Sequence, residues 1–328
     1  MIKKADIQRY SKLFLKGEDS SAFAFFYNTY IKPEAQKLTA ISQKEMAKVI
    51  DGVPPVEVNH IILRVQGSIN DYEKKTVSIF KEFTKEVYTP ILFERLGTTK
   101  PELKATIMRQ TLSEFTDKTR GALANTDAAV VRSIRKMQTD IIKNNLKIAA
   151  KENIPGILSK EVNAFKAGLT KELRKNNPDF YRMLEKGTLI KSRTRADGTY
   201  ISYSLENYAE MSVRTTLLNV ERTSVEVAAL DEEAPLVGYE LIDDRPLKGE
   251  EREICQHIIN NKVRGKSVLA LTQDVADALG IMTIDEAKAD GAMGVNCRHG
   301  LVPLDTEYLI EVEKVLLLKG LSTGLEVA

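Results

Sequence analysis

The chain has 328 residues, of which 43% are hydrophobic and 29% are charged, a composition that suits a soluble globular protein of two domains. No apolar run approaches the length of a membrane-spanning helix, and the first residues lack the apolar segment of a secretory signal. Two cysteines cannot make a disulfide framework, so we expect folding in a reducing cytosol.

Charge is distributed unevenly along the chain. The net charge is +2 overall, but residues 1–186 carry +11 and residues 187–328 carry −9. One interpretation is a chance imbalance between two solvated surfaces. The other is a basic part that contacts a polyanion such as DNA through counterion release. There is no strongly basic run, so sequence-specific recognition of DNA is not indicated.

Apolar residues recur at helical spacing through the first half of the chain, interrupted by "DGVPP" at 51–55 and by "NIPG" at 153–156. Pro90 should kink or shorten the second long segment. The predicted helices cover about 5–17, 20–50, 56–95, 102–152, 158–175 and 178–186.

The longest predicted helix carries a partial heptad pattern. Ile134, Met137, Ile141 and Ile148 fall at core positions, and Asn144 occupies the remaining one. This pattern fits a helix buried in a bundle or a dimeric coiled coil. It favours the bundle because it does not continue for enough heptads.

The character of the sequence changes at residue 187. The dipeptide Asp197-Gly198 predicts a β-hairpin, and a helix of about 25 residues follows, with Ser204 as its N-cap. Strands are predicted at 235–242 and 298–304, a short helix or turn at 249–261, a short helix at 272–281, and a final helix at 307–320.

We therefore predict an α+β fold with a long-helix, all-α N-terminal part. The expected division is an elongated helical domain at 1–186, a compact α+β domain at 187–306, and a C-terminal helix with a loose tail at 307–328.

The spacing Cys-x-His occurs twice, as Cys255/His257 and Cys297/His299. Two cysteines and two histidines are enough for a tetrahedral Zn²⁺ site, although zinc sites more often use C-x₂₋₄-C and H-x₃₋₅-H. If residues 253–260 form a helix, Cys255 and His257 point about 200° apart and cannot easily share a metal.

Three other interpretations of these residues stay open. The cysteines can form a disulfide if their Cα atoms approach within about 7 Å. They can instead be small buried thiols, with histidines bonded to the backbone or left on the surface. A Cys–His nucleophile needs a geometry that neighbouring residues on one strand rarely reach. The Gly-Lys-Ser at 265–267 is not a P-loop, because Asn260 stands where the first glycine is required.

Three stretches of the second half carry a family resemblance: "YAEMSVRT" at 208–215, "EICQHI" at 253–258 and "NCRH" at 296–299 before a strand. With these, residues 187–306 resemble the minor capsid protein 2 family of tailed phages, which is similar to the Mu-type head morphogenesis proteins. The chain departs from that pattern where relatives show C-x-x-C, here Cys255-Gln-His257, and where they show His-Pro, here Gly294-Val295. His257 can take the place of the second cysteine.

The resemblance implies a structural protein of the phage head that is not an enzyme. It implies several copies per virion near the portal vertex, bound to the portal or the major capsid protein, after synthesis in the host cytoplasm. It also implies a part in DNA packaging or ejection, non-specific DNA contact through the basic helical half, and no membrane in the assembled head. The alternative is an enzyme, ADP-ribosyltransferase-like or thiol-dependent, carried by the C-terminal domain.

Overall fold

The computed structural model describes residues 2–96, 101–187, 190–194, 200–242, 252–293, 297 and 299–322. The first part of the chain is helical, as predicted. Its elements are α1 (Lys4–Leu15), α2 (Asp19–Phe26), the π-helix η1 (Tyr27–Ile31), α3 (Lys32–Ile50), α4 (Pro55–Phe83), the π-helix η2 (Thr84–Tyr88), α5 (Thr89–Leu96), α6 (Pro101–Glu152), α7 (Ser159–Asn176) and α8 (Pro178–Lys186).

Both π-helical segments end two residues before a proline. η1 ends at Ile31, before Pro33, and η2 ends at Tyr88, before Pro90. A proline in a helix lacks an N–H and pushes against the carbonyl four residues earlier, and a widened π turn relieves both problems. The predicted interruption at Pro90 is thus confirmed, and Pro33 causes an equivalent one that the pattern analysis did not identify.

The second part contains strands as well as helices, which confirms the α+β class. Its elements are β1 (Ile190–Thr194), β2 (Tyr200–Tyr203), α9 (Leu205–Asp231), β3 (Leu236–Leu241), α10 (Glu253–Asn260), β4 (Lys262–Val263), β5 (Lys266–Ala270), α11 (Gln273–Leu279), α12 (Ile284–Ala289), β6 (His299–Val302) and α13 (Thr306–Leu318).

The strands form two antiparallel sheets. β1 pairs with β2 as the predicted hairpin, and the turn at Asp197-Gly198 lies outside the described residues. The larger sheet has the order β4-β5-β3-β6, with β3 between β5 and β6. Ser204 caps α9 as predicted, because its Oγ accepts a hydrogen bond from the N–H of Asn207 at 3.1 Å.

The hairpin of β4 and β5 is not among the predicted elements. Its turn places Arg264 at φ 47° and Gly265 at φ 87°, two successive left-handed residues as a type I′ turn requires. The glycine of the Gly-Lys-Ser sequence is therefore a turn residue between strands. The short helix α12 is also missing from the prediction.

The described residues gather into two compact units. Unit 1 contains residues 1–26, 80–115 and 213–328, and unit 2 contains residues 27–79 and 116–212. Each unit draws on both sides of residue 187. The division into domains at 1–186, 187–306 and 307–328 remains a prediction, since contacts do not measure which segments fold independently.

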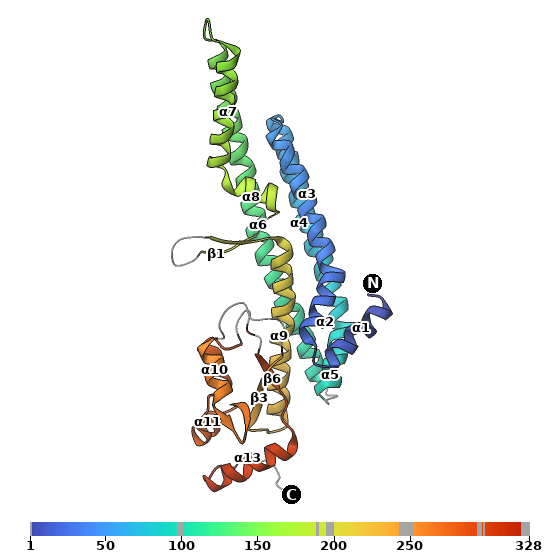
Figure 1. Ribbon diagram of the computed structural model, residues 1–328. Helices are drawn as coiled ribbons and strands as arrows, with labels where there is room; N and C mark the ends of the chain where they lie inside the picture. Colours follow the sequence, from blue (N-terminus) through green and yellow to red (C-terminus); the bar gives the residue numbers. More distant parts are fainter. Residues whose placement is uncertain are drawn as a thin grey trace. The chain divides into compact units, whose positions relative to one another are not determined.

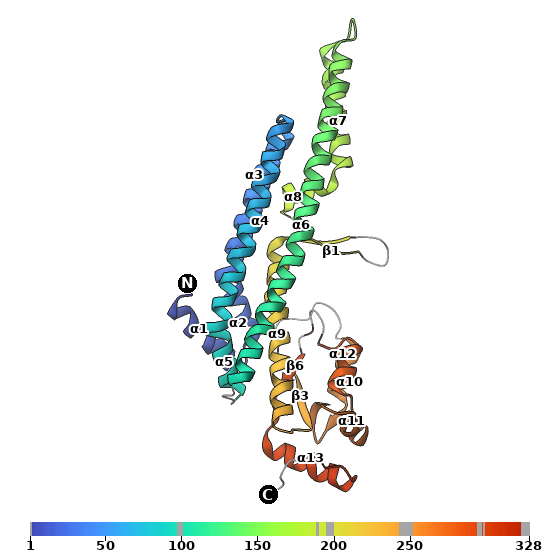
Figure 2. The same ribbon diagram turned by 180° about the vertical axis from the view of Figure 1, so that it is seen from behind.

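Unit 2 is built from helical hairpins: α3 and α4 lie side by side, and α7 folds back along α6 (Figures 1 and 2). Its core includes Ile61 of α4 with Ile134 and Met137 of α6, all fully buried. Asn144 donates to the carbonyl of Leu169 in α7 at 3.4 Å. Ile134, Met137 and Ile141 thus pack within the chain, as the bundle interpretation predicts, whereas Ile148 is not part of this core.

Unit 1 has a second core around the larger sheet. Val225 of α9, Tyr239 of β3, Cys255 of α10 and Leu301 of β6 share one cluster of buried side chains. In Figure 1, β3 lies between α9 and the group formed by α10 and α11. In β3, at the centre of the sheet, residues 236–239 are buried and residues 240 and 241 are exposed.

Among the helices of the described ranges, none combines the length and the apolar character that spanning a membrane requires.

Candidate metal centre

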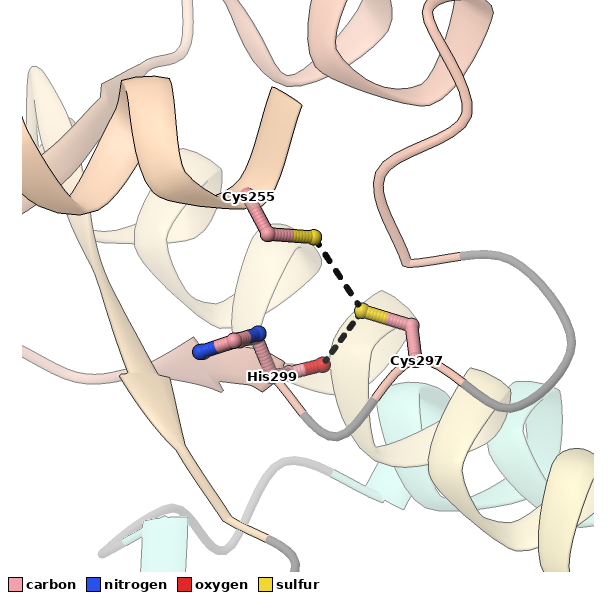
Figure 3. A group of neighbouring side chains, drawn as sticks. All are labelled: Cys255, Cys297 and His299. Carbon is pink, nitrogen blue, oxygen red and sulfur yellow. Dashed lines mark hydrogen bonds between the residues drawn. The ribbon is translucent and has the colours of Figure 1, made fainter. Parts of the chain in front are cut away.

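Three of the four predicted site residues meet in unit 1 although 42 residues separate the two cysteines. Cys255 lies in the first turn of α10, Cys297 precedes β6, and His299 is the first residue of β6. Their ligand atoms lie within 4.8 Å of one another, and the side chains are 2%, 5% and 4% exposed. In Figure 3 the two sulfur atoms point toward each other.

His257 does not join this group of described residues. It lies two positions after Cys255 in α10, and the 200° separation predicted for a helix turns it to the surface. There it lines a shallow pocket with Arg252, Met282 and Asp290. The helical geometry of α10 therefore separates the first Cys-x-His pair, whereas the second pair stays together.

The distance between the sulfurs, 3.8 Å, fits a tetrahedral metal site. Two thiolates bound to Zn²⁺ at about 2.3 Å with tetrahedral angles stand about 3.8 Å apart. A disulfide needs about 2.05 Å, and both cysteines are free. The interpretation as hydrogen-bonded buried thiols fits the same distance. Cys255, Cys297 and His299 can thus hold a metal ion.

Tyr239 of β3 completes the surroundings of the sulfurs. Its hydroxyl donates to Sγ of Cys255 at 3.3 Å and lies 3.8 Å from Sγ of Cys297. Its ring stacks on the imidazole of His299, with the centroids 5.1 Å apart. Burial raises the pKa of the Tyr239 hydroxyl. The pattern analysis missed this residue, although its place on the predicted strand 235–242 is a usable signal.

The pKa values of the two thiols shift in opposite directions. A hydrogen bond from Cys255 lowers the pKa of Cys297 well below its usual range, while the same bond and burial raise the pKa of Cys255. Of the two, Cys297 is thus the thiol that ionises more readily. A divalent metal binds thiolates and would displace the thiol protons.

Arg222 of α9 holds the segment that carries Cys297. It is 4% exposed, and its guanidinium donates to the carbonyls of Met293 at 2.6 Å and His299 at 2.5 Å. A third contact reaches the carbonyl of Cys297 at 3.5 Å. Arginine suits this task because its planar fork has five donors. This positioning residue was not predicted, since nothing in the spacing of α9 distinguishes it from other arginines.

Comparison of the chain with models of known protein families, with curated proteins and with solved structures finds no match.

Proposed function

We propose that the chain is a structural protein of a phage head, a minor capsid or head morphogenesis component bound to the portal or the inner capsid in several copies. The observation that carries the proposal is the closed cluster of Cys255, Cys297 and His299. These residues belong to the stretches on which the resemblance rests, and they meet although they are distant in sequence.

The burial of this cluster favours a structural role over the enzymatic alternative. The sulfurs belong to side chains that are at most 5% exposed, so a substrate has no direct path to a nucleophilic thiolate. The cluster connects α10 to the residue that precedes β6, and Tyr239 adds β3 to the connection. Contacts of this kind stabilise a small sheet that is packed against short helices.

We further propose that the metal is Zn²⁺ in a structural site. Cys255, Cys297 and His299 would supply three ligands, and the hydroxyl of Tyr239 or a water molecule the fourth. Bound zinc would supply fixed geometry and no chemistry of its own. Elemental analysis of the purified chain, with about one zinc per chain expected, tests this proposal separately from the role in the head.

Association with head components tests the role itself. The purified chain is sedimented with portal assemblies and with capsid shells from the same phage, at about 50 and 300 mM salt. We expect co-sedimentation with one of them, and density for the paired helices of unit 2 near the portal vertex in images of intact particles. Failure to associate at any salt concentration, together with absence from purified virions, would overturn the proposal.

A further inference from the structure

The positive charge of unit 2 is concentrated on one helical hairpin. Residues 132–176, which form the second half of α6, its connection to α7 and α7 itself, contain 11 Lys and Arg against 4 Asp and Glu. This segment therefore carries a net charge of +7, most of the excess found in residues 1–186.

The basic residues of α6 form a row on one face. Arg132, Arg135, Lys143 and Lys147 are all exposed, and at about 100° per residue they fall within an arc of about 120°. The opposite face carries Ile134 and Met137, which are buried in the core of unit 2. At about 1.5 Å per residue the row is about 22 Å long and straight. We call these four residues the α6 row.

Among the described residues, none of the four cations of the row forms an ion pair. Of the acidic groups nearby on α6, Glu152 pairs with Lys166 at 2.7 Å, and Asp140 accepts from the side-chain amide of Asn177 at 2.9 Å. Four solvated cations held at fixed spacing without partners repel one another. An elongated polyanion would relieve that repulsion.

A groove continues the row toward α4. It has a volume of about 550 Å³. Its charged lining residues are the three cations Arg132, Arg135 and Lys136 and the one acidic residue Asp127, all of α6, and Gln66 of α4 faces them. Gln66 donates to Asp127 of α6 at 3.0 Å, and this hydrogen bond joins the two helices that line the groove, α4 and α6. The charged face is therefore concave at one end, and a phosphate backbone can enter it.

We propose that the α6 row and this groove bind the phosphate backbone of duplex DNA without sequence preference. A duplex presents one phosphate per strand for every 3.4 Å or so of its axis, so the row spans about six base pairs. The row carries no aromatic side chain on which single-stranded bases could stack, which favours a duplex over a single strand. This inference deepens the proposed role in the head by naming a partner and the surface that contacts it.

An acidic protein is the competing partner. Protein interfaces have an apolar or aromatic centre and are depleted in lysine. This face has the exposed Leu146 between its cations and the exposed Ile142 at its edge, and it is rich in Lys and Arg. The Leu146→Ser variant therefore distinguishes the two partners. It should leave DNA affinity within about twofold, because phosphate contacts do not involve leucine.

The test is fluorescence anisotropy of a labelled 30-base-pair duplex with the full chain at 50 to 200 mM salt. The variant R132Q/R135Q/K143Q/K147Q should bind at least about tenfold more weakly at 100 mM salt. The slope of log affinity against log salt should fall by about 3 to 4. The matched control K37Q/K44Q/K74Q/K81Q removes four exposed lysines from α3 and α4 and should retain the affinity of the parent.

Two results would overturn the inference: no duplex binding by the parent at 50 mM salt, or equal losses in the two quadruple variants. Loss of binding through Leu146→Ser would point to a protein partner instead. DNA affinity of the isolated chain is independent of portal or capsid association, so failure here and failure of the proposed function are distinguishable.

Discussion

At the scale of single residues, the cluster in unit 1 shows how one helix decides which of two identical spacings makes a site. The pair Cys297/His299 stays together before and at the start of β6, where both side chains are buried. The pair Cys255/His257 is split by the helical turn of α10, and only its cysteine is retained.

We predict that the metal content depends on the two cysteines of the cluster. Cys297→Ser and Cys255→Ser should each remove the zinc, because a site with two remaining protein ligands binds it far more weakly. They should also cost more than about 2 kcal/mol of stability, since structural zinc binding contributes directly to folding. Elemental analysis and thermal unfolding measure the two effects.

His257→Ala is the matched control, because it removes a histidine of the same helix that faces the surface. It should keep both the zinc and the melting temperature of the parent. Equal zinc content in Cys297→Ser and the parent would show that the cluster is not the metal site.

Glu221 of α9 is a buried acidic residue of unit 1, at 2% exposure. Its Oε1 accepts from Nη1 of Arg95 at 2.8 Å, and the same nitrogen bonds Asp19 at 2.9 Å. Burial, and then the Asp19 carboxylate, raise the pKa of Glu221 to about 8. One guanidinium thus faces two carboxyl groups, and one of them keeps its proton at neutral pH.

The raised pKa predicts that stability declines toward alkaline pH. In the unfolded chain the carboxyl titrates near pH 4.3, so between about pH 4.3 and 8 the folded chain holds a proton that the unfolded chain has lost. The contribution of this group is complete below that range and lost as pH rises through about 8. Glu221→Gln should therefore flatten the decline in unfolding free energy measured by urea titration from pH 5 to 9.

The exposed Glu232→Gln serves as the control for that series, because it removes one carboxylate at the end of α9 without touching Arg95. Its unfolding free energy should depend on pH in the same way as that of the parent. If the unfolding free energy of Glu221→Gln also follows the parent from pH 5 to 9, Glu221 is not the group whose protonation stabilises the folded chain.

At the scale of elements, the π-helices show that prolines inside long helices are accommodated by one extra residue. In η2 that residue can be removed without disturbing either flank, since the helices before and after keep their own registers. Glu86 is the suitable position, because its side chain is exposed and its ion pair is with the neighbouring Lys85.

We therefore predict that deleting Glu86 together with Pro90→Ala gives one continuous α-helix and a melting temperature within a few degrees of the parent. The lost surface ion pair is worth less than about 1 kcal/mol. Deleting the exposed Lys74 within α4 should instead prevent cooperative unfolding. That deletion rotates Phe80 and Phe83 by about 100° out of the core. Circular dichroism melts compare the two, and similar damage in both would contradict this account of η2.

The helices and most strands were predictable because local pattern decides them. The 3.6-residue period of Ile134 and Met137 and the cap at Ser204 act within a few residues of the chain. The β4–β5 hairpin was not predicted, because Arg264 occupies its turn at a position where asparagine or aspartate is usual. Arginine is rare at positive φ. Cys297 and His299, two of the candidate metal ligands, were predictable as a pair from their spacing.

The remainder of the site depends on tertiary contacts. Arg222 and Tyr239 reach Cys297 from α9 and β3, which are 75 and 58 residues away in sequence. No spacing within either element encodes such a contact. The exclusion of His257, by contrast, follows from the helical state of residues 253–260 alone.

At the scale of the whole molecule, the two units differ in what holds them together. Unit 2 depends on helix packing around Ile61 and Ile134, and unit 1 on a sheet with a buried Cys/His cluster. The basic hairpin belongs to unit 2 and the candidate metal to unit 1. The proposed DNA-binding surface and the proposed metal site therefore belong to different units.

The division predicts that removing the metal loosens one unit only. Bound zinc would link α10 to the start of β6, so its chelation should raise the rate of amide hydrogen exchange in β3, β5, β6 and α10 by about tenfold or more. The core of unit 2 contains none of the cluster residues, so exchange in α3 and in residues 116–152 of α6 should stay unchanged. Hydrogen exchange with mass spectrometry resolves these segments, and Cys297→Ser should reproduce the chelated pattern. If exchange accelerates equally in both units, they open as one cooperative structure and the cluster stabilises the entire chain.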